Sequence, residues 1–520
     1  MRITARELDL CKAQAQFDDI CQFLRDALRD GKRLDQCERG MFPKAMEMCL
    51  LLLKAFVEAH GDGDQGAEVE REGRKLRRLE KPHDKRYLSI FGELIISRFV
   101  YGTREGQAHE WKPLDAAVGL PKDDNSYVLE DWLQRFCVKD AYAEVVDDLR
   151  ALLGTTVSVR TAERINRDMG SYTEDYRRSQ GMPGPEEDAP ILVVSADGTG
   201  VPMRTSLEQR LAEKTKEAAG ADEVAKSRGI EESSETEEPA AKGSKDSERR
   251  GKKQMAYVGS VYTIEPHVRT ADDVVDEVRR RKRASKRPRP VHKHLWAEMT
   301  HFREGEVLPG TPLLFVQMSV EVQRRDSNRE KTLVCLMDGD RHLWNLQKEW
   351  LGRATGILDL YHAMRRLWAV ADCLYAKGCP AASEFITHHL RMLLEGKVGY
   401  VIRNFRKLLK THAAEWDANK KETVESAIGY YHNNRAHMRY DVYMAAGYPI
   451  ASGVIEGACN HFVKDRMDGS GMRWEIEGAQ SMLSLRAIYL NDQWEEFINY
   501  RVESEQAALY GEATQAALAA

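Results

Sequence analysis

Long apolar segments and paired cysteines are both missing from this chain of 520 residues. No uninterrupted apolar stretch approaches the roughly 18 residues of a membrane span, and the first residues lack the apolar region of a signal peptide. The nine cysteines include no Cys-x-x-Cys pair and no Cys/His cluster at zinc spacing, which argues against disulfides and structural zinc. We therefore expect an intracellular, globular protein of roughly three domains that does not enter a membrane.

Charge is unevenly distributed around a formal net value of −5. Residues 206–250 are poor in aromatics and rich in Glu, Lys, Ser and Ala, so they cannot bury enough apolar surface to order themselves, and we predict a disordered charged insertion. Residues 279–290, "RRRKRASKRPRP", are strongly basic. Such a run could displace counterions from a phosphate backbone, although a solvated surface explains it equally well.

The N-terminal part shows helical and then strand periodicity. Residues 5–60 have the apolar spacing of a helical hairpin within a helical region over 1–80, and the charged stretch 62–85 predicts a loop. Residues 87–101 alternate around Gly92 in the manner of a β-hairpin. We expect both hairpins to be structural.

Three further helices complete a predicted domain over residues 81–175. Ser126, Asp140 and Ser158 are candidate N-caps, and Gly154 can end the second helix. In the third helix one face is apolar, whereas the other carries the set Arg160, Thr161, Arg164 and Arg167. A helix–turn–helix unit would bury the first face and present the second to a DNA groove.

Three acidic residues stand in suggestive positions. Asp197 follows the apolar run 191–196 and Asp338 follows the run 332–337, so each is placed at the end of a buried strand. Glu456 opens a helical pattern rich in small residues. Converging carboxylates hold hard divalent cations such as Mg²⁺, and a metal pair can drive in-line phosphoryl transfer. The pattern therefore predicts a polynucleotidyl transferase.

Other charged residues extend this candidate site. Asp359 and His362 are three residues apart where a short apolar run enters a helix, and a capping role competes with a catalytic one. Beyond Glu456 come three cations that could neutralise phosphates flanking the one being cut, namely Lys464, Arg466 and Arg473. The run 256–264 predicts a further strand, and 312–320 predicts either a strand or a helix.

An ordered series of motifs resembles the ISKra-type insertion-sequence transposases of the Mutator-like DDE group. The motifs are "VSADGTGVPM", "LMDGDRHLWNL", "ILDLYHAMRRLW", "NNRAHMRY" and the block beginning "YPIASGVIEGACNHF". The resemblance implies an α/β fold with a ribonuclease-H-like mixed sheet flanked by helices, interrupted by an all-helical insertion. It also implies Asp197, Asp338 and Glu456 as the catalytic, metal-binding triad for two Mg²⁺ or Mn²⁺ ions. Asp359 and His362 match the Asp-x-x-His signature of Mutator-like enzymes.

The domain boundaries follow from these assignments. After the N-terminal domains we expect the first part of the catalytic core over 185–362, the all-helical insertion over 363–448, the C-terminal helices of the core over 449–502 and a flexible tail over 503–520. One departure from the motif leaves two candidates for the second acid, because Asp340 follows Asp338 and Gly339. We favour Asp338, since it directly follows the strand, whereas Asp340 is placed to start the next helix.

The implied activity is hydrolysis at transposon ends followed by strand transfer into target DNA. The implied partners are double-stranded DNA, in the form of terminal inverted repeats and target, and further copies of the chain in a dimer or larger assembly. The implied location is the bacterial cytoplasm, at the nucleoid. Alternatives are a catalytically silent DNA-binding protein derived from a transposase and a stand-alone ribonuclease-H-like nuclease. Tyr361 or Tyr443 could in principle be the nucleophile of a tyrosine recombinase, but the lack of an accompanying Arg-His-Arg constellation argues against this.

Overall fold

The computed structural model describes residues 8–71, 73–103, 110–181, 188–204, 253–279, 287–303, 306–376, 378–469 and 471–511. The chain divides into two units, Met1–Arg178 with Gln493–Ala520 and Ser179–Asp492, here called unit 1 and unit 2. The predicted insertion over 206–250 and most of the basic run 279–290 lie outside the described residues.

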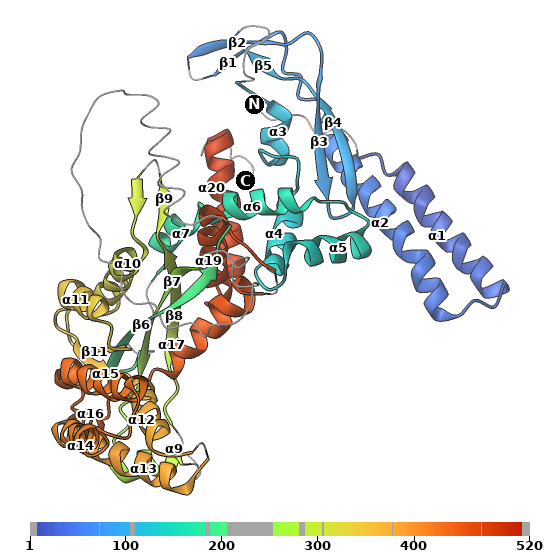
Figure 1. Cartoon of the computed structure of the whole chain (residues 1–520). Helices are drawn as coiled ribbons and strands as arrows, with labels where there is room; N and C mark the ends of the chain where they lie inside the picture. Colours follow the sequence, from blue (N-terminus) through green and yellow to red (C-terminus); the bar gives the residue numbers. More distant parts are fainter. Residues whose placement is uncertain are drawn as a thin grey trace, which may run out of the picture. The chain divides into compact units, whose positions relative to one another are not determined.

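Unit 1 begins with the predicted helical hairpin, formed by α1 (Cys11–Arg29) and α2 (Leu34–Ala59) (Figure 1). The predicted β-hairpin is also confirmed, because β3 (His83–Ser89) and β4 (Gly92–Arg98) pair antiparallel. The loop predicted over 62–85 is wrong. Two antiparallel strands, β1 (Glu68–Arg71) and β2 (Arg74–Arg78), occupy its centre, and β5 (Tyr101–Gly102) joins β2. These strands are rich in charged residues and have largely exposed side chains, so they lack the apolar alternation on which the strand prediction was based.

Short helices and one long C-terminal helix complete unit 1. They are α3 (Pro113–Val118), α4 (Tyr127–Cys137), α5 (Tyr142–Leu153), α6 (Val159–Gly170), α7 (Thr173–Ser179) and α20 (Trp494–Tyr510). Ser126 and Ser158 cap α4 and α6 as predicted, and Gly154 ends α5 with a φ of 68°. Asp140 does not cap α5, because the helix begins one residue later, with Ala141 at the N-cap position.

Helix α20 corrects the C-terminal boundary. It belongs to unit 1 and continues to Tyr510, whereas a flexible tail was predicted from residue 503. A buried ion pair explains this, since Arg501 Nη2 lies 2.5 Å from Glu130 Oε2 of α4. Leaving either charge buried without its partner would be strongly destabilising, so the pair fixes α20 against α4.

Unit 2 is built on a five-stranded mixed sheet with strand order β12-β11-β6-β7-β8. The strands are β6 (Ile191–Pro202), β7 (Lys253–Ile264), β8 (Val291–Met299), β11 (Thr332–Met337) and β12 (Thr355–Leu358). Strands β6, β7 and β8 run antiparallel, whereas β11 is parallel to β6 and β12 is parallel to β11. The first residues of β6 and nearly all of β11 are buried, as expected for central strands covered on both faces.

Helices flank this sheet. They include α9 (Ala271–Val278), α10 (Gly310–Arg325), α11 (Arg341–Trp350), α12 (Leu360–Leu374), α13 (Pro380–Leu394), α14 (Val398–Thr411), α15 (Ala418–Asn434) and α16 (Tyr440–Ala445). The ambiguous run 312–320 is helical, within α10. Described residues of 363–448 contain helices and no strand, as predicted. However, they share one hydrophobic core with the sheet and lie in the same unit, so they do not form a separate domain.

The C-terminal part of unit 2 continues from α17 (Gly453–Ala458) into a π-helical segment (Cys459–Lys464) and α18 (Asp465–Met467), followed by α19 (Ile476–Leu490). Helix α19 packs against β8. Two short strands, β9 (His301–Arg303) and β10 (Glu306–Leu308), form a separate antiparallel pair. Among the described residues, none of the helices combines the length and apolar character needed to cross a membrane.

Candidate active site

Strand register in unit 2 brings three aspartates level with one another, toward the carboxyl ends of the parallel strands. Ala196 of β6 and Leu358 of β12 are both paired with Met337 of β11. The next residues along the chain are Asp197, Asp338 and Asp359. Asp338 and Asp359 directly follow their strands, but Asp197 lies within β6, which continues to Pro202, so the predicted strand end at Asp197 is wrong. Carboxyl ends of parallel strands are where open α/β sheets place their ligand sites.

Asp197 and Asp338 line a cavity of about 700 Å³ together with Glu456 of α17. Asp340, His362, Arg365, Arg366, Tyr430, Cys459, Asn460 and Lys464 are among its other lining residues. The fold therefore brings the three sequence-predicted acids together, although Glu456 is 118 residues beyond Asp338 in the chain. Asp359 is not among the lining residues.

Asp197 is held by short polar contacts. Its Oδ1 accepts a hydrogen bond from the Gly198 N–H at 2.7 Å, and its Oδ2 accepts one from the Cys459 thiol at 3.6 Å. Burial, reinforced by the negative charge of Asp197, raises the pKa of Cys459. The thiol therefore stays protonated and acts as a donor that orients the carboxylate.

Asp338 and Asp340 have different tasks. Asp340 is exposed and caps α11, since its Oδ1 accepts a hydrogen bond from the His342 N–H at 2.6 Å. Asp338 is half-buried, and its Oδ1 accepts a hydrogen bond from the Asp340 N–H at 2.9 Å. Burial raises the pKa of Asp338, and the nearby charge of Asp197 adds to this effect. Because Asp338 follows the strand beside Asp197 and Asp340 is used as a helix cap, Asp338 is the better candidate partner of Asp197 in the site.

Gly339 and Tyr430 fix the turn that carries Asp338. Gly339 has a φ of +99°, in the region that favours glycine, and an added Cβ would lie 2.8 Å from Leu358 Cδ1. The Tyr430 hydroxyl on α15 donates a hydrogen bond to the backbone oxygen of Asp338 at 2.5 Å. The helical segment between β12 and Glu456 thus supports the strand end directly.

Asp359 positions other residues of the site. It is 1% exposed, and its Oδ2 accepts hydrogen bonds from the His362 N–H at 3.0 Å and from His362 Nδ1 at 2.8 Å. Its Oδ1 accepts a hydrogen bond at 2.6 Å from the N–H of Ser452, which directly precedes α17. One buried carboxylate therefore joins the imidazole in the cavity to the start of the helix that carries Glu456.

Asp359 and His362 shift each other's pKa. Burial alone would raise the pKa of Asp359, but hydrogen bonds from His362 and from the Ser452 N–H lower it below its ordinary value. The hydrogen bond to Asp359 raises the pKa of His362, against burial, and the charges of Asp197 and Asp338 act in the same direction. The pair therefore favours an imidazolium facing the acidic cavity.

The π-helical segment aligns residues that follow Glu456. A four-residue step overshoots one turn of an α-helix but falls short of one turn in a π-helix, whose hydrogen bonds run from i to i+5. The step from Glu456 to Asn460 spans the end of α17 and the start of the π-helical segment, and the step from Asn460 to Lys464 lies within that segment. Each step is close to one full turn, so all three residues stay on the side of the helix that lines the cavity. Such π segments often occur at functional sites.

Arg365 and Arg366 are cavity residues that the sequence reasoning did not single out. They follow His362 by three and four residues on α12, so helical spacing would have placed them on its face. Both are exposed, and the Arg366 guanidinium lies 4.8 Å from the centre of the Tyr430 ring. With Lys464 they put three cations on the rim of a cavity whose lining includes four carboxylates.

The donor chemistry of this cavity fits hard divalent cations. Oxygen atoms of Asp197, Asp338 and Glu456 are of the type that Mg²⁺ prefers. Burial raises the pKa of Asp338, with a further contribution from the charge of Asp197, and a bound cation would favour the ionised carboxylate against both effects. Within the part of the chain that the structure describes, no three His, Cys, Asp or Glu side chains stand close enough together to hold an ion as they are. Glu456 is exposed, so its side chain is the one with room to move.

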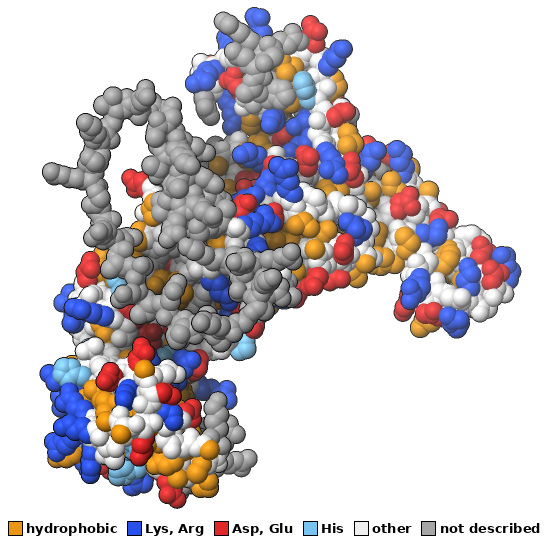
Figure 2. Space-filling model, in the orientation of Figure 1, with side chains coloured by type: hydrophobic (Ala, Val, Ile, Leu, Met, Phe, Trp, Pro, Cys, Tyr) orange, Lys and Arg blue, Asp and Glu red, His pale blue; other side chains and the backbone are white. Residues whose placement is uncertain are grey.

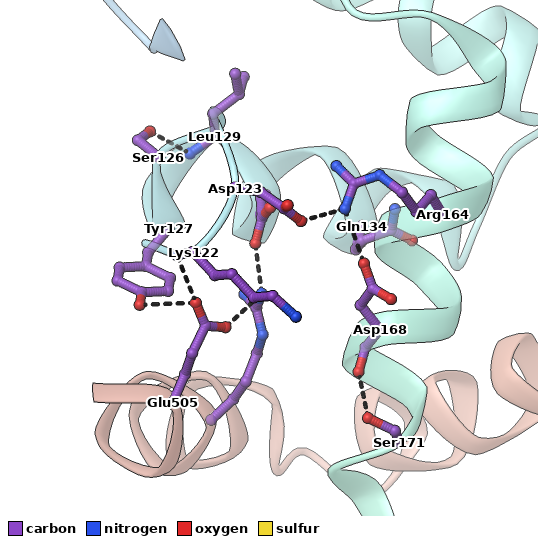
Figure 3. Close-up of polar contacts among 12 residues, drawn as sticks. Lys122, Asp123, Ser126, Tyr127, Leu129, Gln134, Arg164, Asp168, Ser171 and Glu505 are labelled. Carbon is purple, nitrogen blue, oxygen red and sulfur yellow. Dashed lines mark hydrogen bonds and ion pairs between the residues drawn. The ribbon is translucent and has the colours of Figure 1, made fainter. Parts of the chain in front are cut away.

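The predicted DNA-binding face of α6 in unit 1 is only partly available. Arg160 is exposed and Thr161 is half-buried, with its hydroxyl 2.8 Å from that of Ser158. The Arg164 guanidinium lies between two carboxylates, pairing with Asp123 and with Asp168 Oδ2 at 2.9 Å (Figure 3). Figure 2 shows basic and acidic side chains interleaved around α6 rather than a purely basic surface.

The predicted phosphate-binding cations after Glu456 also differ from one another. Lys464 lines the cavity, and Arg473 is half-buried with Nη1 donating to the Met472 carbonyl at 2.8 Å. Arg466 corrects the prediction, since it is only 1% exposed and its guanidinium lies 4.9 Å from the centre of the Trp474 ring. Its role is to pack the turn that leads into α19, and it cannot reach a DNA backbone in this structure.

No protein-family model matches this chain, and a search of curated proteins also found no match.

Proposed function

We propose that this chain is a DDE-type DNA transposase with a ribonuclease-H-like core. The observation that carries the proposal is the register of β6, β11 and β12, which sets Asp197 beside Asp338 at the edge of a cavity that Glu456 also lines. The mixed sheet, with three antiparallel strands and two parallel strands added beside the first, supports such a core. The ordered motifs around these acids support the more specific reading as an ISKra-type transposase.

Asp197, Asp338 and Glu456 would hold two Mg²⁺ or Mn²⁺ ions. Such ions would supply Lewis acidity and neutralise charge on the phosphoryl group in an in-line displacement. The residues around them would hold and orient the DNA. Arg365, Arg366 and Lys464 can contact phosphates beside the one that is cut, because they stand on the rim of the cavity.

His362 would contribute positive charge facing the substrate, with Asp359 fixing the orientation of its ring. The Cys459 thiol would keep Asp197 pointing toward the cavity. The reaction would release a 3′-hydroxyl at the transposon end, and that hydroxyl would then attack target DNA. No side chain is required to form a covalent bond to DNA.

An assay on DNA separates this proposal from its alternatives. Purified protein is incubated with Mg²⁺, a target plasmid and a labelled duplex carrying inverted repeats from the flanks of its gene. We expect nicking at the repeat end and joining to the plasmid. Binding without nicking would indicate a catalytically silent DNA-binding protein, and nicking without joining would indicate a stand-alone nuclease.

A further inference from the structure

The helical hairpin of unit 1 is held together by a heptad seam. Residues of α1 that face α2 repeat at steps of three and four, and they are Ala13, Gln16, Ile20, Phe23 and Ala27. The matching residues of α2 are Cys37, Met41, Lys44, Met48, Leu51 and Ala55. The contact between Gly40 and the Phe23 ring and the hydrogen bond from Gln16 to the Lys44 carbonyl lie along this seam. Such spacing is typical of paired helices in a coiled coil.

A second apolar stripe on each helix lies outside the seam. On α1 it comprises Leu10, Phe17, Cys21, Leu24 and Leu28, and on α2 it comprises Phe42, Ala45, Cys49, Leu52 and Phe56. These positions again repeat at steps of three, four or seven. None of the stripe residues named is charged, although Glu38, four residues before Phe42, lies on the same face at the start of α2. The largest side chains remain exposed, with values of 48% for Phe17, 51% for Phe42 and 50% for Phe56.

Both stripes lie on the same side of the hairpin. Most stripe residues come one residue after a seam residue, as Cys21 follows Ile20 and Cys49 follows Met48, and one residue corresponds to about 100° of rotation. Because the two helices are antiparallel, this rotation turns both stripes toward one side. The opposite side is polar, with Lys12, Asp19, Gln22 and Asp26 on α1 and Gln36, Glu47 and Lys54 on α2.

Polar contacts between the helices lie toward that opposite side. Asp19 pairs with Lys44, and Gln16 Nε2 donates to Glu47 Oε2 at 3.0 Å. The hairpin therefore uses its seam and its polar side for its own fold, and a further face of α2, with Leu50, Leu53 and Val57, packs against the β3–β4 hairpin. The apolar side is left without a partner among the described residues of unit 1.

We propose that this apolar side is a homodimer interface, in which the hairpins of two copies pair as a four-helix bundle. A second copy supplies the same heptad spacing and the same uncharged stripes, so its side chains can interlock with those of the first. With 19 residues, α1 is about 28 Å long, and two helices side by side are about 20 Å wide. Pairing would thus bury about 1,100 Å² in total, near the lower bound of stable interfaces.

Sedimentation velocity of the full chain without DNA, under reducing conditions, tests this interface. We expect wild type to sediment at twice the mass of one chain. The double variant Leu24→Lys with Phe56→Lys should raise the dimer Kd at least about 100-fold, because it buries unpaired charges on the apolar side. Gln22→Lys is the control, since it adds one positive charge, against two in the double variant, on the polar side and should leave the Kd unchanged.

Far-UV circular dichroism should show equal helicity in all variants, because the substituted side chains are at least partly exposed in one copy. Leu24→Gln with Phe56→Gln provides a milder second test with an intermediate expected Kd. A wild type that stays monomeric would overturn the proposal and leave the apolar side to a different partner. A lysine double variant that dimerises as tightly as Gln22→Lys would overturn it as well. Because no DNA is present, neither result depends on the proposed transposase activity.

Discussion

The acidic cavity of unit 2 and the arginine face of α6 in unit 1 were both predicted from charged side chains, but the fold uses those charges differently. Asp197, within β6, and Asp338, directly after β11, lie beside each other on adjacent strands, and their charges repel each other. Arg164, in contrast, is paired with carboxylates one turn along its helix and on the segment before α4. Unbalanced charge that the backbone holds in place is the stronger indication of a site, because locally paired surface charge contributes little.

The largest effect that would test this comparison is loss of the cavity acids. Asp197→Asn and Asp338→Asn should each reduce single-turnover DNA nicking at least about 1,000-fold, because each removes charge on which stabilisation of the transition state depends. Asp340→Ala, the neighbouring control, should cost mainly its helix cap, about 1 kcal/mol of stability. Nicking that survives Asp338→Asn and is lost in Asp340→Ala would reverse our assignment.

The buried carboxylate behind the cavity should be the next most sensitive position. Asp359→Ala should lower the free energy of unfolding by about 3 kcal/mol, since it leaves the Ser452 N–H and His362 without their acceptor. Urea titration measures the change, and Ser319→Ala, in α10 outside the cavity, serves as a comparison because, among the described residues, its hydroxyl bonds only the Val316 carbonyl of its own helix. A loss below about 1 kcal/mol would show that Asp359 is not the link between His362 and α17.

The same pair gives a pH dependence of defined sign. The pKa of His362 is raised, so stability from its protonated form is fully present below about pH 6.5 and is lost as pH rises through the raised value. The pKa of Asp359 is lowered, so its contribution is lost only as pH falls through that lowered value. The difference in thermal stability between wild type and His362→Gln should be largest at pH values above the lowered pKa of Asp359 and below the raised pKa of His362. Thermal unfolding over a pH series measures it. A difference that grows above neutral pH would contradict the pairing.

A smaller effect is expected at the turn between Asp338 and Asp340. Gly339→Ala should lower the free energy of unfolding by about 2 kcal/mol, because of the positive φ and the close approach of Leu358. Gly429→Ala is the matched control in α15, where a Cβ meets no atom within 4 Å and alanine is the better helix former. The control should be more stable than wild type by about 0.5–1 kcal/mol. Equal behaviour of the two variants would remove the argument for a constrained turn.

The smallest expected effect concerns α6. Arg160→Ala should weaken DNA binding several-fold and reduce the slope of log affinity against log salt by about 1, if its exposed side chain contacts a phosphate. Arg164→Ala should change the slope less, because Asp123 and Asp168 already neutralise that guanidinium. Fluorescence anisotropy over a salt series measures both. A slope change for Arg164→Ala that is larger than for Arg160→Ala would show that the charge of α6, like that of the cavity, is not balanced by its neighbours.

Sequence patterns were most informative where the chain's own periodicity decides the structure. The run 332–337 is a strand with those bounds, and Ser126 and Ser158 cap their helices as expected. The approach failed where charge accompanies a strand, as in β1 and β2. It also missed β8, which carries two histidines and a lysine within its first residues. Exposure of one face lets such residues occupy a strand without an apolar signature.

The sequence by itself determined that Asp338 follows a buried strand, that Asp340 caps a helix, and that the segment between Asp359 and Glu456 is helical. Only the tertiary structure decided that β6 continues past Asp197, that Ala196, Met337 and Leu358 align across the three strands, and that Asp359 turns inward to bond His362 and Ser452. It also decided that Arg466 is buried and that one side of the α1–α2 hairpin stays apolar and exposed. Caps and periodicity depend on neighbours in the chain, whereas register and burial depend on pairings between residues that are distant in sequence.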